Sequence, residues 1–161
     1  MKQTLYNFSV LNNDDEEVPL SRYKGRVLLI LNTNSDDLYH QEFKTLEYLY
    51  KKYQPFGLEI LAFPSNKFSE GMILEDQDLK QDFNRKYDID YQVMKKIQLD
   101  KDNTHPLFRY LTESKNQIFK NEIKRAFTMF LISREGRIVK RFNSARSLDE
   151  LENSIQKYIE G

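Results

Sequence analysis

Short apolar runs recur along the chain, separated by polar segments. Val27–Leu31 is a continuous apolar run, and two further stretches, Leu58–Phe63 and Ala126–Ile132, are apolar except for Glu59 and Thr128. Each of the three is typical of a strand that a sheet buries on both faces. Ile138–Phe142 instead mixes apolar and polar positions after the turn at 134–137, which contains a glycine. It predicts a fourth strand, antiparallel to the third.

Helical spacing of apolar residues appears between these runs. The pattern predicts helices over Tyr39–Tyr53 and Asp76–Tyr87, and another that begins at Asn103–Pro106. A final helix follows Ser147, because Ser147 and Glu150 have the spacing of a capping box. Strands and helices therefore alternate along most of the chain.

Two weaker patterns complete the prediction. Leu5–Leu11 and Val18–Leu20 flank a polar turn, which predicts an N-terminal β-hairpin, and Val93–Ile97 predicts a short strand. The segment 65–75 has little periodicity and is predicted to be a loop.

A βαβ unit followed by a ββα unit indicates an α/β protein with the thioredoxin layout, a central mixed sheet flanked by helices. We expect residues 1–161 to form a single domain.

Composition narrows the classes of function. Lys plus Arg and Asp plus Glu both number 25, so no basic excess favours nucleic acid. No apolar run reaches the length of about 18 residues that a membrane helix needs, and we expect a soluble, cytoplasmic protein. The chain contains no cysteine, which excludes disulfides, thiolate nucleophiles, cysteine metal sites and dithiol redox chemistry.

The candidate chemistry lies directly after the first buried strand. The polar turn 32–37 leads into a predicted helix, and Asp36 or Asp37 is a suitable N-cap for it. Such a helix start presents free backbone N–H groups and a positive dipole end. Asp36, Asp37 and His40 have one-turn spacing, but such a trio is usually a solvated helix face, so we expect neither a metal nor a cofactor. His105, which precedes Pro106, is interpreted as a helix-start residue and not as a general base.

Four stretches carry a resemblance to one family. In the order of the corresponding motifs of glutathione peroxidases, the chain contains Lys24–Asn32 (KGRVLLILN), Leu58–Phe68 (LEILAFPSNKF), Lys95–Phe108 (KKI through HPLF) and Phe127–Phe142. The second stretch, for example, resembles the family motif LEILAFPCNQF. The resemblance spans nearly the whole chain and implies a thioredoxin-like fold of the glutathione-peroxidase subtype.

The resemblance also implies a chemistry. In this family a thiol or selenol at the start of the first helix attacks a hydroperoxide. A Gln, a Trp and an Asn activate this nucleophile, and the four residues form the catalytic tetrad. In members without selenium a second cysteine often resolves the sulfenic acid as a disulfide, which thioredoxin then reduces.

None of these functional residues is present here. The peroxidatic position falls on Asp37, or on Asp36 or Leu38 if a nearby length difference is placed differently. The other three positions of the tetrad fall on Lys67, Arg125 and Ala126.

The positions of the family's other cysteines have also changed. The Cys of the FPC motif is Ser65, and the resolving position is Asn84. Peroxide reduction needs an atom that attacks the O–O bond and is itself oxidised, and a carboxylate has no such redox couple. The sequence therefore predicts a family member without thiol peroxidase activity.

Several alternatives stay open for the former active site. Asp37, Lys67 and Arg125 would form an ionic cluster if the family geometry persists, or the aspartates would act as helix caps alone. Lys67 and Arg125 could instead bind a small anion. In each of these cases the protein would have a non-enzymatic role, in binding or structure, with an unidentified partner. The alternative function is the reduction of hydroperoxides through some other group, with glutathione or thioredoxin as reductant. The short segment between Leu111 and Phe127 resembles members without the oligomerisation insert and predicts a monomer.

Overall fold

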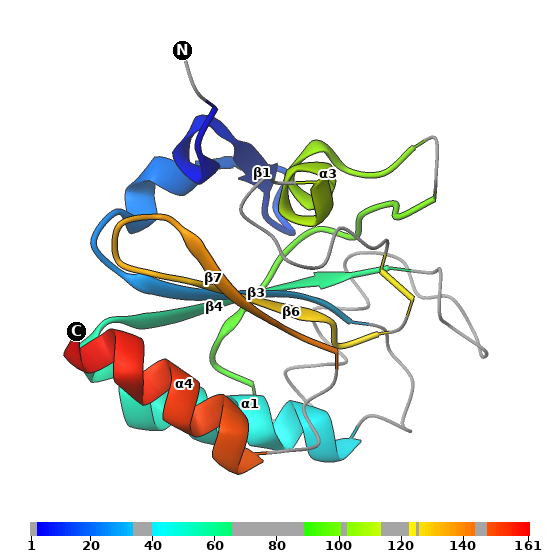
Figure 1. The fold of residues 1–161 in the computed structure, drawn as a ribbon. Helices are drawn as coiled ribbons and strands as arrows, with labels where there is room; N and C mark the ends of the chain where they lie inside the picture. The colour runs from blue at the N-terminus through cyan, green and yellow to red at the C-terminus, as the bar shows by residue number, and fades with distance from the viewer. Residues whose placement is uncertain are drawn as a thin grey trace.

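A mixed β-sheet forms the centre of the molecule (Figure 1). The computed structural model describes residues 3–33, 40–65, 89–100, 103–113, 123–124, 126–143 and 148–161. Within these residues the sheet has the strand order β5-β4-β3-β6-β7. Its strands are β3 (Val27–Thr33), β4 (Leu58–Pro64), β5 (Gln92–Val93), β6 (Met129–Ile132) and β7 (Ile138–Phe142).

The strand directions explain the sequence pattern. β3 pairs in parallel with β4, and β4 with β5, whereas β6 runs antiparallel to β3 and β7 antiparallel to β6. Each residue of β3 is buried because the strand is central and both of its faces are covered. Edge strand β7 is only partly buried, which is consistent with the polar residues Lys140 and Arg141 in its sequence.

Helices cover both faces of the sheet. In Figure 1, α1 (His40–Tyr53) and α4 (Leu148–Glu160) lie on one face, and α3 (Pro106–Glu113) lies on the other with the N-terminal hairpin. Side chains of β3 alternate between two cores: Leu29 and Leu31 pack toward α1 and α4, and Leu28 and Ile30 pack toward α3. The predicted thioredoxin layout is therefore confirmed.

The hairpin was predicted correctly, but its strands are shorter than expected. β1 (Ser9–Leu11) and β2 (Glu17–Pro19) pair antiparallel through Val10 and Val18. Leu5–Asn7 is a 3₁₀ turn and not strand, because the Asn7 carboxamide oxygen accepts a hydrogen bond from the Thr4 N–H at 2.7 Å. Leu20, predicted to be extended, begins a second 3₁₀ turn, Leu20–Tyr23.

Two other strands also differ from the prediction. Val93–Ile97 was predicted as one strand, whereas β5 ends at Val93 and Ile97 forms an isolated bridge with Ser65. Ala126–Ile132 was predicted as a buried strand, but β6 begins at Met129 because Phe127 has a φ of +63°. A left-handed residue cannot continue an extended strand.

The predicted helices are confirmed where the structure describes them. α1, α3 and α4 occupy the expected ranges, with Pro106 in the first turn of α3. The helix predicted at 76–87, most of the loop at 65–75 and the cap at Ser147 lie outside the described residues. No helix in the described ranges is both long and apolar enough to cross a membrane.

A polar contact joins the two helices on one face of the sheet. Glu152 of α4 accepts hydrogen bonds from Lys52 Nζ at 2.7 Å and from the Tyr53 hydroxyl at 2.6 Å. The hydrogen bond from Lys52 and then that from Tyr53 lower the pKa of the Glu152 carboxyl, since both favour its charged form. This contact fixes the C-terminal end of α1 on α4.

Candidate functional site

The carboxyl ends of β3 and β4 lie side by side, and α1 is the next described element after β3. Thr33 is in register with Pro64, and the Ser65 N–H donates a hydrogen bond of 2.8 Å to the Thr33 carbonyl. In open α/β sheets this edge is the usual place of a ligand or catalytic group. It is also the edge to which the sequence assigned the candidate chemistry.

Asn32 organises the backbone at this edge. Its side chain is fully buried, and its Oδ1 accepts a hydrogen bond from the Thr128 N–H at 3.1 Å. Its carbonyl accepts a hydrogen bond from the Phe127 N–H at 2.8 Å, and its own N–H donates to the Thr128 carbonyl at 3.4 Å. The end of β3 thus holds the turn that precedes β6 through both main chain and side chain.

The described side chains here offer little catalytic chemistry. Ala126, at the family's Asn position, is 2% exposed, and its methyl group neither donates nor accepts a hydrogen bond. Ser65, at the FPC cysteine position, is buried as well. The buried Thr33 hydroxyl has no hydrogen-bond partner among the described residues. A serine or threonine hydroxyl at its ordinary pKa is a weak nucleophile without an adjacent base.

Most of the predicted site lies outside the described residues. Asp36, Asp37, Leu38, Lys67, Asn84 and Arg125 all belong to this group, as does the side chain of His40. The ionic cluster and the anion site therefore stay predictions. Across the ranges that the structure does describe, no three His, Cys, Asp or Glu side chains form a group that could hold a metal ion.

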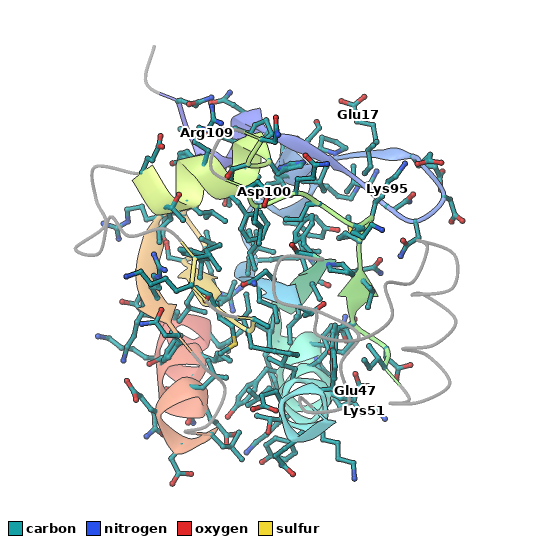
Figure 2. All side chains as sticks on the ribbon, turned by 90° about the vertical axis from the view of Figure 1, so that its right-hand side faces the viewer. Glu17, Glu47, Lys51, Lys95, Asp100 and Arg109 are labelled. Atoms are coloured by element: carbon teal, nitrogen blue, oxygen red, sulfur yellow. The ribbon has the colours of Figure 1, made fainter. Side chains whose placement is uncertain are left out.

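Glu47 is a buried carboxylate that the sequence did not reveal. It lies on α1, where it is buried, and Figure 2 shows it beside Lys51. Its Oε2 accepts a hydrogen bond from the Asp90 N–H at 3.0 Å, and its Oε1 lies 3.7 Å from Lys51 Nζ. Burial raises the pKa of the Glu47 carboxyl, opposed by the hydrogen bond from Asp90. The only sign of its burial in the sequence was its position among the apolar residues of α1. Its hydrogen bond from the Asp90 N–H connects α1 to the segment that leads into β5.

His105 lies at the start of α3, as the sequence predicted, and the structure shows that its side chain caps this helix. Its Nδ1 accepts a hydrogen bond of 3.1 Å from the N–H of Leu107, the second residue of α3. This satisfies one of the free donors at the start of the helix, and Pro106 removes another. Burial lowers the pKa of the His105 imidazole below its ordinary value of 6.5. The cap also requires an unprotonated Nδ1.

We expect His105 to make the protein less stable in acid. Because its pKa is lower in the folded state, the unfolded chain binds the proton more readily as the pH falls below 6.5, and the free energy of unfolding decreases. His105→Asn keeps an acceptor for the cap but does not titrate. Urea unfolding at about pH 7.5 and pH 5.5 should show a smaller loss of stability in the variant than in the wild type. An equal loss in both would contradict the prediction, and His40→Gln controls for the second imidazole.

Sequence comparisons place these features among known proteins. The family model described as glutathione peroxidase matches residues 5–112. A probable phospholipid hydroperoxide glutathione peroxidase of Solanum lycopersicum is 37% identical over 98% of this chain and 94% of its own length. The glutathione peroxidase homolog BsaA of Staphylococcus aureus strain MW2 is 36% identical over 98% of this chain and 99% of its own length.

Solved structures give the same result for the fold. The apo-form crystal structure of Trgpx has a TM-score of 0.80 at 28% identity and covers 100% of this chain and 98% of its own. GPX1 of T. cruzi has a TM-score of 0.74 at 32% identity, covering 99% of this chain and 98% of its own. A thioredoxin-family thiol:disulfide interchange protein of Chlorobium tepidum TLS shares the fold at 14% identity, with a TM-score of 0.70 and coverage of 94% and 92%.

Proposed function

The chain belongs to the glutathione peroxidase family, and from this premise we propose that it is a member without thiol peroxidase activity that has a binding or structural role. The absence of cysteine from its full sequence carries the proposal. Peroxide reduction by this family needs a thiolate or selenolate that is oxidised by the substrate. A chain with no such group cannot begin that cycle.

The described residues of the site support this proposal. Ala126 offers no hydrogen-bond donor where the family's Asn would activate the nucleophile. Met94 and Met129, the methionines in the described ranges, are both buried, so their thioethers are not presented to a peroxide. A single lost residue would be consistent with an otherwise functional site, whereas here the nucleophile and its partners are all replaced.

We extend the proposal to the charged residues at the remaining family positions. In the family arrangement, the Asp37 carboxylate would stand at the peroxidatic position, between the Lys67 ammonium and the Arg125 guanidinium. Charge-assisted hydrogen bonds would then replace the catalytic contacts. The supporting observation is that hydrogen bonds fix the described backbone beside these positions, as the contacts of Asn32 with the 126–128 turn illustrate.

A peroxide-consumption assay tests the proposed loss of activity. The purified protein is given hydrogen peroxide or a phospholipid hydroperoxide, with glutathione or thioredoxin as reductant, and its turnover is compared with that of a heat-denatured sample. We expect no difference between the two, because the native chain has no oxidisable nucleophile. Turnover by the native protein above the denatured control would refute the proposal and favour the hydroperoxide-reducing alternative that the names of the relatives suggest.

The same assay can show whether the site is retained. The reconstituted variant carries Asp37→Cys, Lys67→Gln, Arg125→Trp and Ala126→Asn, and its matched control carries the last three substitutions only. Activity that appears with the cysteine and not in the control would assign the loss to these side chains alone.

We further propose that the protein is a monomer in the cytoplasm. The edge strand β7 supports the monomer, since it carries Lys140 and Arg141, and cations on a sheet edge disfavour pairing with another strand. Lys140 is exposed and pairs with Glu150 of α4 at 3.1 Å. The proposed location rests on the sequence alone.

A further inference from the structure

Phe127 has a backbone conformation that its residue type disfavours. Its φ is +63°, in the left-handed region that bulky residues rarely occupy. Such a residue costs on the order of 1–3 kcal/mol and persists only where its surroundings impose the conformation. At Phe127 the chain turns between Ala126 and the start of β6, so this conformation decides where Ala126 lies.

The groups that impose the conformation come from the end of β3. Asn32 receives the Phe127 N–H on its carbonyl and the Thr128 N–H on its side chain, so a single residue fixes two consecutive amides. Because Asn32 is fully buried, no solvent competes for these hydrogen bonds. A leucine there would have nearly the same volume but would leave the Thr128 N–H without that acceptor.

The turn also connects the sheet to α1. With the left-handed backbone, the Phe127 ring packs edge-to-face on Phe43 of α1, with ring centroids 4.9 Å apart. Both rings are buried in the core that α1 shares with the sheet. Asn32, Phe127 and Phe43 therefore form a continuous contact from β3 through the turn to the helix.

We propose that Asn32 is the positioning residue of this site: its amide and carbonyl impose the left-handed conformation of Phe127, and thereby keep Ala126 buried at the carboxyl end of β3 with Phe127 against α1. This inference rests on the proposed function, because it concerns the same site, in which the backbone is present and the catalytic side chains are replaced. It assigns the retained geometry to one residue outside the catalytic tetrad.

Native-state hydrogen exchange, followed by NMR, tests the assignment. In Asn32→Leu we expect the Phe127 and Thr128 amides to lose at least about tenfold more protection than the amides of the paired residues Ile30 and Phe130 in the β3–β6 ladder, because the turn opens locally. The Cα chemical shift of Phe127 should also move away from the value of a left-handed residue. A residue that only adds global stability would lower protection equally throughout and leave that shift unchanged, and this result would overturn the proposal.

Thr33→Val is the matched control. Thr33 is the neighbour of Asn32 on β3, and this substitution also replaces a buried polar side chain. The Thr33 hydroxyl, however, has no hydrogen-bond partner in the described part of the chain. We expect its exchange pattern at 127–128 to match the wild type; the same local loss as in Asn32→Leu would contradict the assignment to Asn32.

Two further measurements keep the test decisive. If Asn32→Leu does not fold, Asn32→Ser gives the same comparison with a side chain too short to reach Thr128. In the wild-type protein, the Thr128 amide should be protected as strongly as the ladder, and rapid exchange of this amide would overturn the proposal. None of these measurements depends on peroxidase activity, so failure of this inference is distinguishable from failure of the proposed function.

Discussion

Replacement of Phe108 by alanine is expected to destabilise the protein by about 3–5 kcal/mol, the range for a large aromatic removed from a packed core. Phe108 lies on α3 with no exposed surface and packs edge-to-face on Phe63 at 5.3 Å and on Phe130 at 6.4 Å between ring centroids. The substitution would leave a cavity where α3 meets β4 and β6. For a chain of this size the melting temperature should fall by roughly 6–20 °C, measured by circular dichroism.

Phe56→Ala is the matched control for this prediction. Phe56 has the same side chain but is 64% exposed, in the turn between α1 and β4. Its removal should change the free energy of unfolding by no more than about 0.5 kcal/mol. Similar losses from both variants would show that the core between α3 and the sheet is not packed as described.

Gly136→Ala should have the second-largest effect, about 2–4 kcal/mol of destabilisation. Gly136 lies in the β6–β7 turn with a φ of +83°, which costs an alanine about 1 kcal/mol or more. The new methyl group would also lie 2.5 Å from Cε2 and 2.8 Å from Cζ of Tyr6. The Tyr6 ring would have to move, and forcing extra volume into a packed contact costs about 1–3 kcal/mol.

Gly25→Ala separates the two contributions. Gly25 has nearly the same φ, +85°, but a methyl group there would meet no atom within 4 Å. Its loss of stability, measured by urea unfolding, should therefore equal the backbone cost alone, about 1 kcal/mol. Equal losses at the two glycines would mean that Tyr6 does not pack against the turn.

Much of the fold could be predicted from the sequence because it depends on local pattern. The paired central strands formed at Val27–Leu31, which is apolar throughout, and at Leu58–Phe63, which is apolar except for Glu59, because a strand covered on both faces favours apolar residues. The helical spacing in Tyr39–Tyr53 likewise became α1. The missing cysteine was equally decisive, because thiol chemistry requires a thiol group and no other residue type supplies one.

The tertiary structure decided what depends on partners distant in the chain. Ala126–Thr128 was predicted as the start of a strand, yet Asn32, about a hundred residues away in sequence, accepts hydrogen bonds from the Phe127 and Thr128 amides, and the strand begins later. Glu47 is likewise buried because the Asp90 N–H meets it from another segment. The sequence alone determined which chemistry this protein lacks. The structure decided which residue holds the 126–128 turn at the edge where that chemistry would occur, because hydrogen bonds between distant segments leave no periodic signal in the sequence.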